Sequence, residues 1–382
     1  MLKNFKYKTY STGIWFNEGA LADPSGLSGL HHLVEHSLFR DKEITVLKDK
    51  LEQNGCYINA FTTYDITAVY IQCVEKFRPL ADQLIEDCQA QLSLNEALFK
   101  TEKKVVKSEI QYYKSDPIEY LADILSVLAN NSKPIPKILG TVKTIDDITI
   151  DDLKRIYSKM LNNYIVVNSL PEIAKNCLKD SDVSQDNNFQ KLDTDRSLYW
   201  TTFGNSKNTY YYGINFSIPK SMAEIYTDIF EILNKEFMEV IREKYGLAYR
   251  IERNMTMDTD TVYLKFVFQS NNKNYDKLIL LVAHIWKNFK KQDSKNLAIK
   301  LEQQKETTKN MQQIKTDNPI GAIKSLAINN LSLFNKQKSS NLAECLSALS
   351  SINYNQVLLV PTSVQQVRGG IKIGQGIISA LE

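Results

Sequence analysis

Histidine is scarce in this chain, because only four of its 382 residues are histidine. No run of about eighteen apolar residues occurs, so we expect no membrane-spanning helix. The first residues lack the apolar segment of a secretion signal, which argues against export. The five cysteines are odd in number, widely spaced and without a C-x-x-C pair, which predicts reduced thiols and a cytoplasmic protein. No Gly-rich phosphate loop or basic block is present, so no nucleic-acid partner is expected.

Three of the four histidines fall within six residues, at His31, His32 and His36. His32 and His36 frame Glu35 in the pattern H-x-x-E-H. Positions i, i+3 and i+4 share one face of a helix, so both imidazoles can face one metal ion with Glu35 beside them. The alternative is an ordinary amphipathic helix whose histidines are surface residues or hydrogen-bonded core residues.

The surroundings of this motif favour a helix. Residues 23–26, Asp-Pro-Ser-Gly, form a turn and helix-start signal. Apolar residues follow at roughly helical spacing: Leu27, Leu30, Leu33, Val34 and Leu38. The motif should therefore lie at the edge of a core, where a metal ion can be shielded.

A catalytic zinc site needs a third protein ligand, and the best candidate lies downstream. Residues 101–113 have a helical composition and contain Glu102 and Glu109, which are seven residues apart. Such residues lie on nearly the same side of a helix, two turns from each other. The alternative is that these glutamates only form solvated pairs with neighbouring lysines.

Taken together, these motifs resemble the pitrilysin, insulin-degrading enzyme and mitochondrial processing peptidase family, the inverzincins, in a short two-domain bacterial form. The resemblance extends beyond the metal motif and keeps the family's order along the chain. It covers the helix at residues 26–39, a G-x3-N-A-x-T strand within residues 55–65, the loop and helix at residues 138–153, and an R-E-x-x-G-L-A-Y segment at residues 242–249.

The resemblance implies a role for each matching residue. His32, His36 and Glu109 would bind one Zn²⁺ per chain. Glu35 would be the general base that activates water, and Glu102 would be a carboxylate that steadies a ligand histidine. His31 is offset by one position from the ligand face, so we interpret it as a flanking residue.

Arg242 and Tyr249 would come from the second domain, and in the family such residues bind the substrate carbonyl and the developing oxyanion. We expect a helix over residues 221–244, a helix end near Gly246 and a strand from Leu247. The alternative for Arg242 is a basic residue that only interacts favourably with the helix C-terminus.

Residues 55–62 predict a turn at Gly55 followed by an exposed edge strand. Such a strand could take up an extended peptide by strand addition. Asn59 and Ala60 are the candidate substrate-binding residues, since the Asn59 side chain can both donate and accept hydrogen bonds. The alternative is that Asn59 only caps the turn.

Strand-like and helix-like segments mix without regular βαβ alternation, which predicts an α+β fold. We expect a metal-binding peptidase domain over residues 1–180, a polar linker over residues 181–197 and a second domain over residues 198–382. The family implies two homologous domains, each a mainly antiparallel sheet with packed helices, that form half of a clam-shell chamber. The Gly-rich tail at residues 368–376 is expected to be a flexible end or a simple hairpin.

The sequence therefore predicts a zinc metalloendopeptidase, a hydrolase that cleaves peptides or unfolded segments inside a closed chamber. Processing of a precursor or leader peptide and general peptide turnover are both compatible with it. Two domains are half of the family's chamber, so we expect a homodimer or a heterodimer with a related subunit. The alternative is a non-catalytic scaffold or partner subunit. A purely structural zinc site is disfavoured, because such sites usually have four protein ligands, often cysteine.

Overall fold

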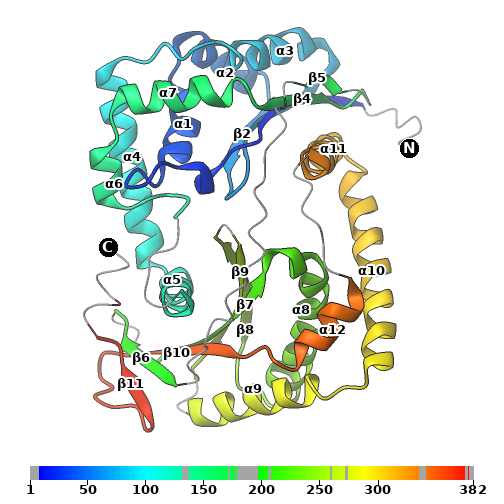
Figure 1. Ribbon diagram of the computed structural model, residues 1–382. Coiled ribbons are helices and arrows are strands. Elements are labelled where there is room, and N and C mark those ends of the chain that lie inside the picture. Colours follow the sequence, from blue (N-terminus) through cyan, green and yellow to red (C-terminus); the bar gives the residue numbers. More distant parts are fainter. Residues whose placement is uncertain are drawn as a thin grey trace. The chain divides into compact units, whose positions relative to one another are not determined.

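A computed structural model shows two compact units, each built around its own β-sheet (Figure 1). The first unit comprises Met1–Gln111, Pro136–Asp186 and Asn310–Lys336, and the second comprises Tyr112–Ile135, Asn187–Lys309 and Gln337–Glu382. The structure describes residues 8–130, 137–170, 173–176, 178, 197–204, 208–258, 260–271, 274–334, 341–374 and 377. Residues 181–196 of the predicted linker lie outside this described part.

The first sheet has the strand order β2-β3-β1-β4-β5, and every neighbouring pair is antiparallel. Its strands are β1 (Thr9–Phe16), β2 (Tyr57–Thr62), β3 (Thr67–Val74), β4 (Tyr164–Asn168) and β5 (Ile173–Asn176). The predicted strand is thus β2, which begins after Gly55 at a φ of 74° and forms one edge of this sheet.

Alternate residues of the first sheet serve two separate cores, as the two-residue period of a strand requires. Ile14 of β1 packs in the core that includes α1 (Leu30–Leu38). Its neighbour Trp15 packs on the other face against α11 (Pro319–Phe334). The sheet therefore holds α1 on one side and α11 on the other.

The remaining helices of the first unit contribute to the same apolar core as α1. They are α2 (Lys42–Gln53), α3 (Arg78–Asp87), α4 (Glu96–Ser115, whose last turn enters the second unit), α6 (Val142–Asp147) and α7 (Ile150–Met160), with 3-10 turns at Ala20–Ala22 and Glu75–Phe77. Helix ends follow local capping chemistry. Asp41 accepts hydrogen bonds from two backbone N–H groups at the start of α2, and Thr141 and Thr149 form capping boxes at α6 and α7.

The second sheet has the order β11-β6-β10-β7-β9-β8. Its strands are β6 (Leu198–Thr202), β7 (Tyr210–Pro219), β8 (Arg250–Met257), β9 (Thr261–Ser270), β10 (Tyr354–Val360) and β11 (Gly370–Lys372). β6 is parallel to β10 and β11, and the other neighbours are antiparallel. The prediction of a flexible end or a simple hairpin was wrong for residues 370–372, because they form β11, which pairs in parallel with β6. A Cβ atom at Gly370 would lie 2.8 Å from the Trp200 ring, so glycine permits this close approach.

The second unit contains the helices α5 (Pro117–Ala129), α8 (Ala223–Phe237), α9 (Tyr275–Phe289), α10 (Ser294–Thr316, whose C-terminal turns enter the first unit) and α12 (Leu342–Leu349). A 3-10 turn at Lys220–Met222 precedes α8, and a π-helical segment at Met238–Lys244 continues it. Gly246 has a positive φ of 58°, as expected after a helix end. The strand predicted from Leu247 begins only at Arg250, because Leu247 is still buried at the helix end and its N–H bonds to the Ile241 carbonyl.

Two helices are exchanged between the halves of the chain: α5, from the N-terminal half, packs in the second unit, and α11, from the C-terminal half, packs in the first unit. α5 contributes Leu121 and Leu125 to an apolar core with Val267 and Val357 of the second sheet. α11 contributes Ile323, in the same way, to the apolar core on the first sheet. The predicted domains, residues 1–180 and 198–382, therefore each contain one helix that belongs to the other unit.

The two mainly antiparallel sheets with packed helices confirm the predicted α+β fold. Within the described residues, no helix combines the length and apolar character that crossing a bilayer requires. Cys56, Cys73, Cys88 and Cys345 are free, buried thiols, whereas Cys177 lies outside the described part.

Candidate metal centre

Helix α1 begins at a carboxylate that compensates for its missing side-chain cap. Gly29 stands before the first helical residue with a φ of 92°, and a Cβ atom there would lie 2.7 Å from the Leu139 carbonyl oxygen. The Asp23 carboxylate accepts hydrogen bonds from the backbone N–H groups of Gly29, at 2.7 Å, and His31, at 3.0 Å. These contacts satisfy N-terminal donors of the helix and fix the direction in which the motif residues point.

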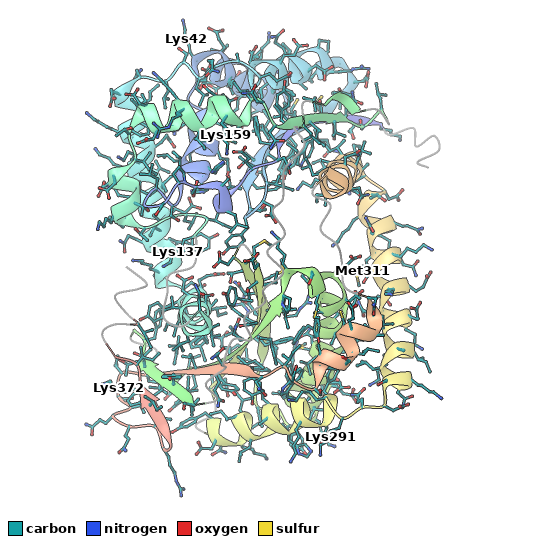
Figure 2. All side chains as sticks on the ribbon, in the orientation of Figure 1. Lys42, Lys137, Lys159, Lys291, Met311 and Lys372 are labelled. Atoms are coloured by element: carbon teal, nitrogen blue, oxygen red, sulfur yellow. The ribbon has the colours of Figure 1, made fainter. Side chains whose placement is uncertain are left out.

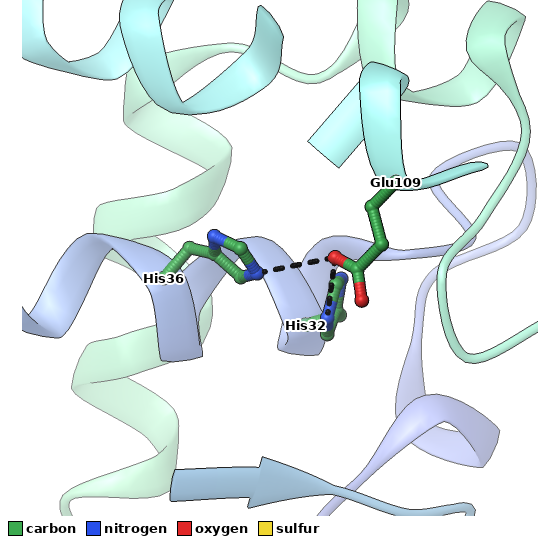
Figure 3. A group of neighbouring side chains, drawn as sticks. All are labelled: His32, His36 and Glu109. Carbon is green, nitrogen blue, oxygen red and sulfur yellow. Dashed lines mark ion pairs between the residues drawn. The ribbon is translucent and has the colours of Figure 1, made fainter. Parts of the chain in front are cut away.

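His32 and His36 turn the same ring nitrogen towards Glu109 of α4 (Figure 3). The Nε2 atoms of His32 and His36 lie 3.6 and 3.4 Å from Oε2 of Glu109. Potential ligand atoms of the three residues all lie within 4.8 Å of one another. The structure thus brings together the three residues that the sequence predicted as ligands.

These separations fit a zinc ion better than direct hydrogen bonds. Zinc ligand distances of about 2.1 Å in a tetrahedron place neighbouring ligand atoms about 3.4 Å apart. Direct N–H···O hydrogen bonds are shorter, with donor and acceptor about 2.7–3.2 Å apart. Two imidazole nitrogens and one carboxylate oxygen are also a common zinc donor set. The side chain of His32 is 8% exposed and that of Glu109 is 33% exposed, so the cluster is shielded at His32 and partly open to solvent at Glu109.

Glu102 lies behind His36 and orients its ring. Oε2 of Glu102 is 3.3 Å from Nδ1 of His36, and Oε1 accepts a hydrogen bond of 2.5 Å from Nε of Arg40. Burial works against the charged carboxylate, but the hydrogen bonds from His36 and Arg40 outweigh it and lower the pKa of Glu102. If a metal ion is bound, an ionised carboxylate on Nδ1 would leave the Nε2 lone pair of His36 directed at that ion.

The two histidines of the cluster have opposite electrostatic surroundings. Burial, with the charge of His36 next, lowers the pKa of His32 to about 4. Burial also opposes the charge of His36, but the facing carboxylates of Glu102 and Glu109 raise its pKa to about 9. The facing imidazole of His36 lowers the pKa of Glu109. Without a metal ion, the cluster therefore holds one imidazolium between two carboxylates.

Glu35 points towards strand β2 and is not among the three clustered ligands. Its Oε2 accepts a hydrogen bond of 2.6 Å from the hydroxyl of Thr62. Burial raises the pKa of Glu35, and the Thr62 hydrogen bond partly offsets this effect. A partly buried carboxyl of raised pKa beside a metal cluster suits a group that accepts and then donates a proton.

His31 lies outside the cluster and is fully buried. Its Nδ1 is 2.6 Å from Oδ1 of Asp23, and its Nε2 is 3.7 Å from Oε2 of Glu18. Glu18 in turn pairs at 3.1 Å with Lys159 of α7, which is labelled in Figure 2. Burial opposes the charged imidazole, but Asp23 and Glu18 outweigh it and raise its pKa. This network ties the start of α1 to the surrounding loops, in agreement with the interpretation of His31 as a flanking residue.

The candidate substrate residues lie on the edge strand β2. Asn59 donates hydrogen bonds of 3.1 Å to the hydroxyls of Tyr57 and Tyr70, and its Oδ1 accepts one from the Ala60 N–H. Asn59 is therefore a mid-strand residue, and the alternative that it caps a turn is wrong. Ala60 packs on the α1 side, in contact with the core of the unit.

Arg242 and Tyr249 lie in the second unit, on either side of the helix end at Gly246. Arg242 belongs to the π-helical segment and is exposed, and the Tyr249 side chain is 50% exposed. The Tyr249 N–H bonds to the Gln269 carbonyl of β9 at 3.1 Å. Both side chains are thus available to a substrate, and their role stays a prediction.

Sequence reasoning missed two residues that contact the predicted site. Arg40 lies in the turn two residues after the end of α1, and its contact with Glu102 of α4 joins residues 62 positions apart, so no local pattern identifies it. Thr62 is the last residue of the N-A-x-T pattern, but its bond to Glu35 depends on how β2 packs beside α1. Only the tertiary structure shows that contact.

Comparisons with known proteins agree with this geometry. Residues 2–141 match the family model described as Insulinase (Peptidase family M16). A zinc protease of Bacillus subtilis, the uncharacterized YmxG, is 25% identical over 179 residues, which cover 45% of this chain and 44% of that protein. The mitochondrial-processing peptidase subunit beta of Rattus norvegicus is 26% identical over 155 residues, which cover 40% of this chain and 32% of the subunit. The matched part thus spans less than half the length of either relative.

Solved structures share the fold over nearly the whole chain. A protease from Helicobacter pylori superposes with a TM-score of 0.71 at 15% identity and covers 93% of this chain and 95% of its own. A peptidase M16 inactive domain from Pseudomonas fluorescens gives 0.67 at 13% identity and covers 95% of both chains. Residues 2–141 are therefore similar to the insulinase family, peptidase family M16, and the chain as a whole shares its fold with the Helicobacter pylori and Pseudomonas fluorescens structures.

Proposed function

We propose that this protein is a zinc-dependent endopeptidase that cleaves peptides or unfolded segments. The observation that carries the proposal is the convergence of His32, His36 and Glu109 on one point, with Glu35 beside them and hydrogen-bonded to the edge strand. A structural zinc site would need a fourth protein ligand. Among the described residues, the candidate metal cluster contains three.

Each residue of the site has a distinct task in this proposal. His32, His36 and Glu109 would hold the ion, and Glu102 keeps the His36 ring in the orientation that ligation requires. Zinc in a three-ligand site lowers the pKa of water and polarises a carbonyl as a Lewis acid. Glu35 takes the proton from the attacking water and returns it to the departing amine.

The edge strand suggests how a substrate is held. Among the described strands, β2 pairs with β3 alone, and its residue Thr62 donates a hydrogen bond to the proposed base Glu35. An extended peptide added to the open edge would gain main-chain hydrogen bonds and run past the cluster. Such a binding mode favours peptides and unfolded segments, because a folded protein does not expose an extended strand. Processing of a precursor or leader peptide is one use that this mode allows.

Arg242 and Tyr249 remain the candidate hydrogen-bond donors to the substrate carbonyl, a role that the family resemblance implies. Donors aimed at the charge that develops on the scissile carbonyl often supply the largest catalytic contribution. Pairing with a second two-domain chain, identical or related, would complete the chamber that we expect. The name of the rat relative, a peptidase subunit, supports the idea of such an assembly.

The test is cleavage of unstructured peptides by the purified protein, followed by mass spectrometry. We expect cuts at internal bonds, loss of cleavage after a zinc chelator and recovery after stoichiometric zinc. A folded protein that contains the same cleavable sequence serves as the control and should remain intact. Cleavage that is insensitive to the chelator would contradict the proposal.

A non-catalytic partner subunit is the second candidate. It is supported by the Pseudomonas fluorescens structure, which is described as an inactive domain and has the same fold. The complete set of His32, Glu35, His36 and Glu109 argues against it. Zinc binding without cleavage by the chain alone, and cleavage once a related subunit is added, would favour this second candidate.

A further inference from the structure

We propose that Lys324 of α11 is a positioning residue for the substrate-binding strand β2. This inference rests on the proposed function and extends it to the face of the sheet opposite the metal cluster. Lys324 is more than 250 positions from β2 in the sequence. Lys324 nevertheless contacts Phe61 of β2 and Tyr70 of the neighbouring strand β3, because α11 packs on the first sheet.

The ammonium group of Lys324 lies over two aromatic side chains. Its Nζ donates a hydrogen bond of 2.9 Å to the hydroxyl of Tyr70. It also lies 4.1 Å from the centre of the Tyr70 ring and 5.5 Å from that of Phe61 on β2. Tyr70 is only 3% exposed, so these contacts are largely shielded from water, where cation–π attraction is strongest.

Tyr70 transmits this contact to the exposed part of β2. Its hydroxyl oxygen accepts a second hydrogen bond, of 3.1 Å, from the Asn59 side chain. Asn59 also donates to the hydroxyl of Tyr57, and its Oδ1 accepts from the Ala60 N–H. Lys324 thus fixes, through one buried tyrosine, the residues at the centre of the edge strand.

β2 is therefore held from both faces. On the α1 side, Thr62 donates to Glu35, and on the α11 side, Phe61 and Asn59 connect to Lys324 and Tyr70. A strand held at alternate residues keeps its register and its open edge straight, which an incoming peptide requires. Lys324 lies on the side opposite α1, so its loss should affect peptide binding much more than zinc binding or proton transfer.

The experiment compares Lys324→Met, Lys324→Arg and the control Lys315→Met, whose side chain is exposed in α10. In Lys324→Met we expect KM for an unstructured peptide to rise by about tenfold, with kcat changed by less than about twofold. Lys324→Arg keeps a cation and donors over the rings and should recover most of the loss. Lys315→Met should match the wild type.

Two further readouts separate positioning from general damage. In a Glu35→Gln background, the dissociation constant of an uncleaved fluorescent peptide should weaken by the same factor, while zinc content stays constant. Amide hydrogen exchange of residues 57–62 should accelerate in Lys324→Met, whereas residues 30–38 keep their protection. Unchanged KM and exchange, or a loss of zinc together with kcat, would overturn the role of Lys324. Absence of peptide binding and cleavage in the wild type would instead overturn the proposed function itself.

Discussion

Nδ1 of His36 lies 3.3 Å from Oε2 of Glu102, while Nε2 of the same ring lies 3.4 Å from Oε2 of Glu109. One imidazole thus bridges two carboxylates that are two turns apart on α4. The contact with Glu102 orients the ring plane, so Nε2 would present its lone pair to a metal ion bound in the cluster. The seven-residue spacing of Glu102 and Glu109 therefore places one carboxylate at each nitrogen of the His36 ring.

Glu102→Gln should therefore weaken zinc binding without removing a ligand. We expect a loss of roughly 10- to 100-fold in affinity, because the neutral amide no longer balances His36 and Arg40. Competition with a zinc-binding dye measures the effect. Glu96→Gln, an exposed residue at the start of the same helix, is the matched control and should retain wild-type affinity. Equal affinities in both variants would contradict the role of Glu102.

Glu109→Gln should have a larger effect, because it replaces the carboxylate ligand itself. A site reduced to two histidines should bind zinc on the order of 100-fold or more weakly. Zinc content after dialysis measures this change, with Glu96→Gln again as the control. Full zinc occupancy in Glu109→Gln would exclude Glu109 as a ligand.

Thr62→Val removes the hydroxyl that holds Glu35 while keeping the shape of the side chain. We expect kcat to fall by roughly five- to twentyfold, since the base is less well oriented towards the attacking water. Zinc content should not change, because Thr62 contacts no predicted ligand in the described structure. Thr101→Val, at an exposed position of α4, serves as the control. A normal kcat in Thr62→Val would show that the hydrogen bond has no catalytic role.

His31→Leu tests whether the third histidine of the motif serves stability rather than metal binding. The substitution leaves the buried carboxylates of Asp23 and Glu18 without their shared imidazole, which should lower the free energy of unfolding by about 3 kcal/mol. Below its melting temperature the variant should still bind one zinc ion. His284→Leu, an exposed position, should change neither property. Loss of zinc from a folded His31→Leu variant would contradict this assignment.

The second unit contains a buried ammonium whose titration is measurable. Lys265 of β9 is 1% exposed, bonds to the Thr256 hydroxyl at 2.7 Å, and faces Asp123 and Glu119 of α5. Burial outweighs these carboxylates and lowers its pKa from 10.5 to about 7. Between these values the unfolded chain holds the proton more tightly than the folded protein. The free energy of unfolding should therefore rise with pH from about 7 to about 10.5, by up to about 1.4 kcal/mol per pH unit from this group.

Lys265→Met should lose this contribution to the slope. Denaturant unfolding at several pH values compares the wild type, Lys265→Met and the control Lys291→Met, whose side chain is exposed on the same unit. Subtracting the free energy of unfolding of Lys265→Met from that of the wild type at each pH cancels the titration of the other groups. Identical slopes in wild type and Lys265→Met would show that Lys265 does not titrate in this range.

The site could be predicted from sequence where its geometry is local. The three candidate ligands come from two helices, and the spacings of His32, His36, Glu102 and Glu109 follow from the helical repeat alone. The edge strand was also predictable, since Gly55 marks its turn. Contacts between distant segments were not predictable in this way. No sequence pattern around Thr62 identifies Glu35 as its neighbour, and none around Lys324 identifies Tyr70.

The exchange of α5 and α11 between the units was likewise beyond the sequence pattern. The helical spacing of apolar residues such as Leu121 and Leu125 predicts that one face of the helix is buried. It does not indicate which of the two sheets covers that face. The parallel pairing of β11 with β6 depends on the close approach of Gly370 to Trp200, which is again a contact of distant residues.

The most direct test of the central claim measures zinc content and peptide cleavage in parallel for wild type and Glu35→Gln. Glu43→Gln, an exposed glutamate of α2, controls for the loss of one charge. We predict about one zinc ion per chain in all three proteins, the stoichiometry of a single catalytic site. Cleavage should persist in wild type and Glu43→Gln and disappear in Glu35→Gln. Cleavage that survives in Glu35→Gln, or a wild type without zinc, would contradict the account.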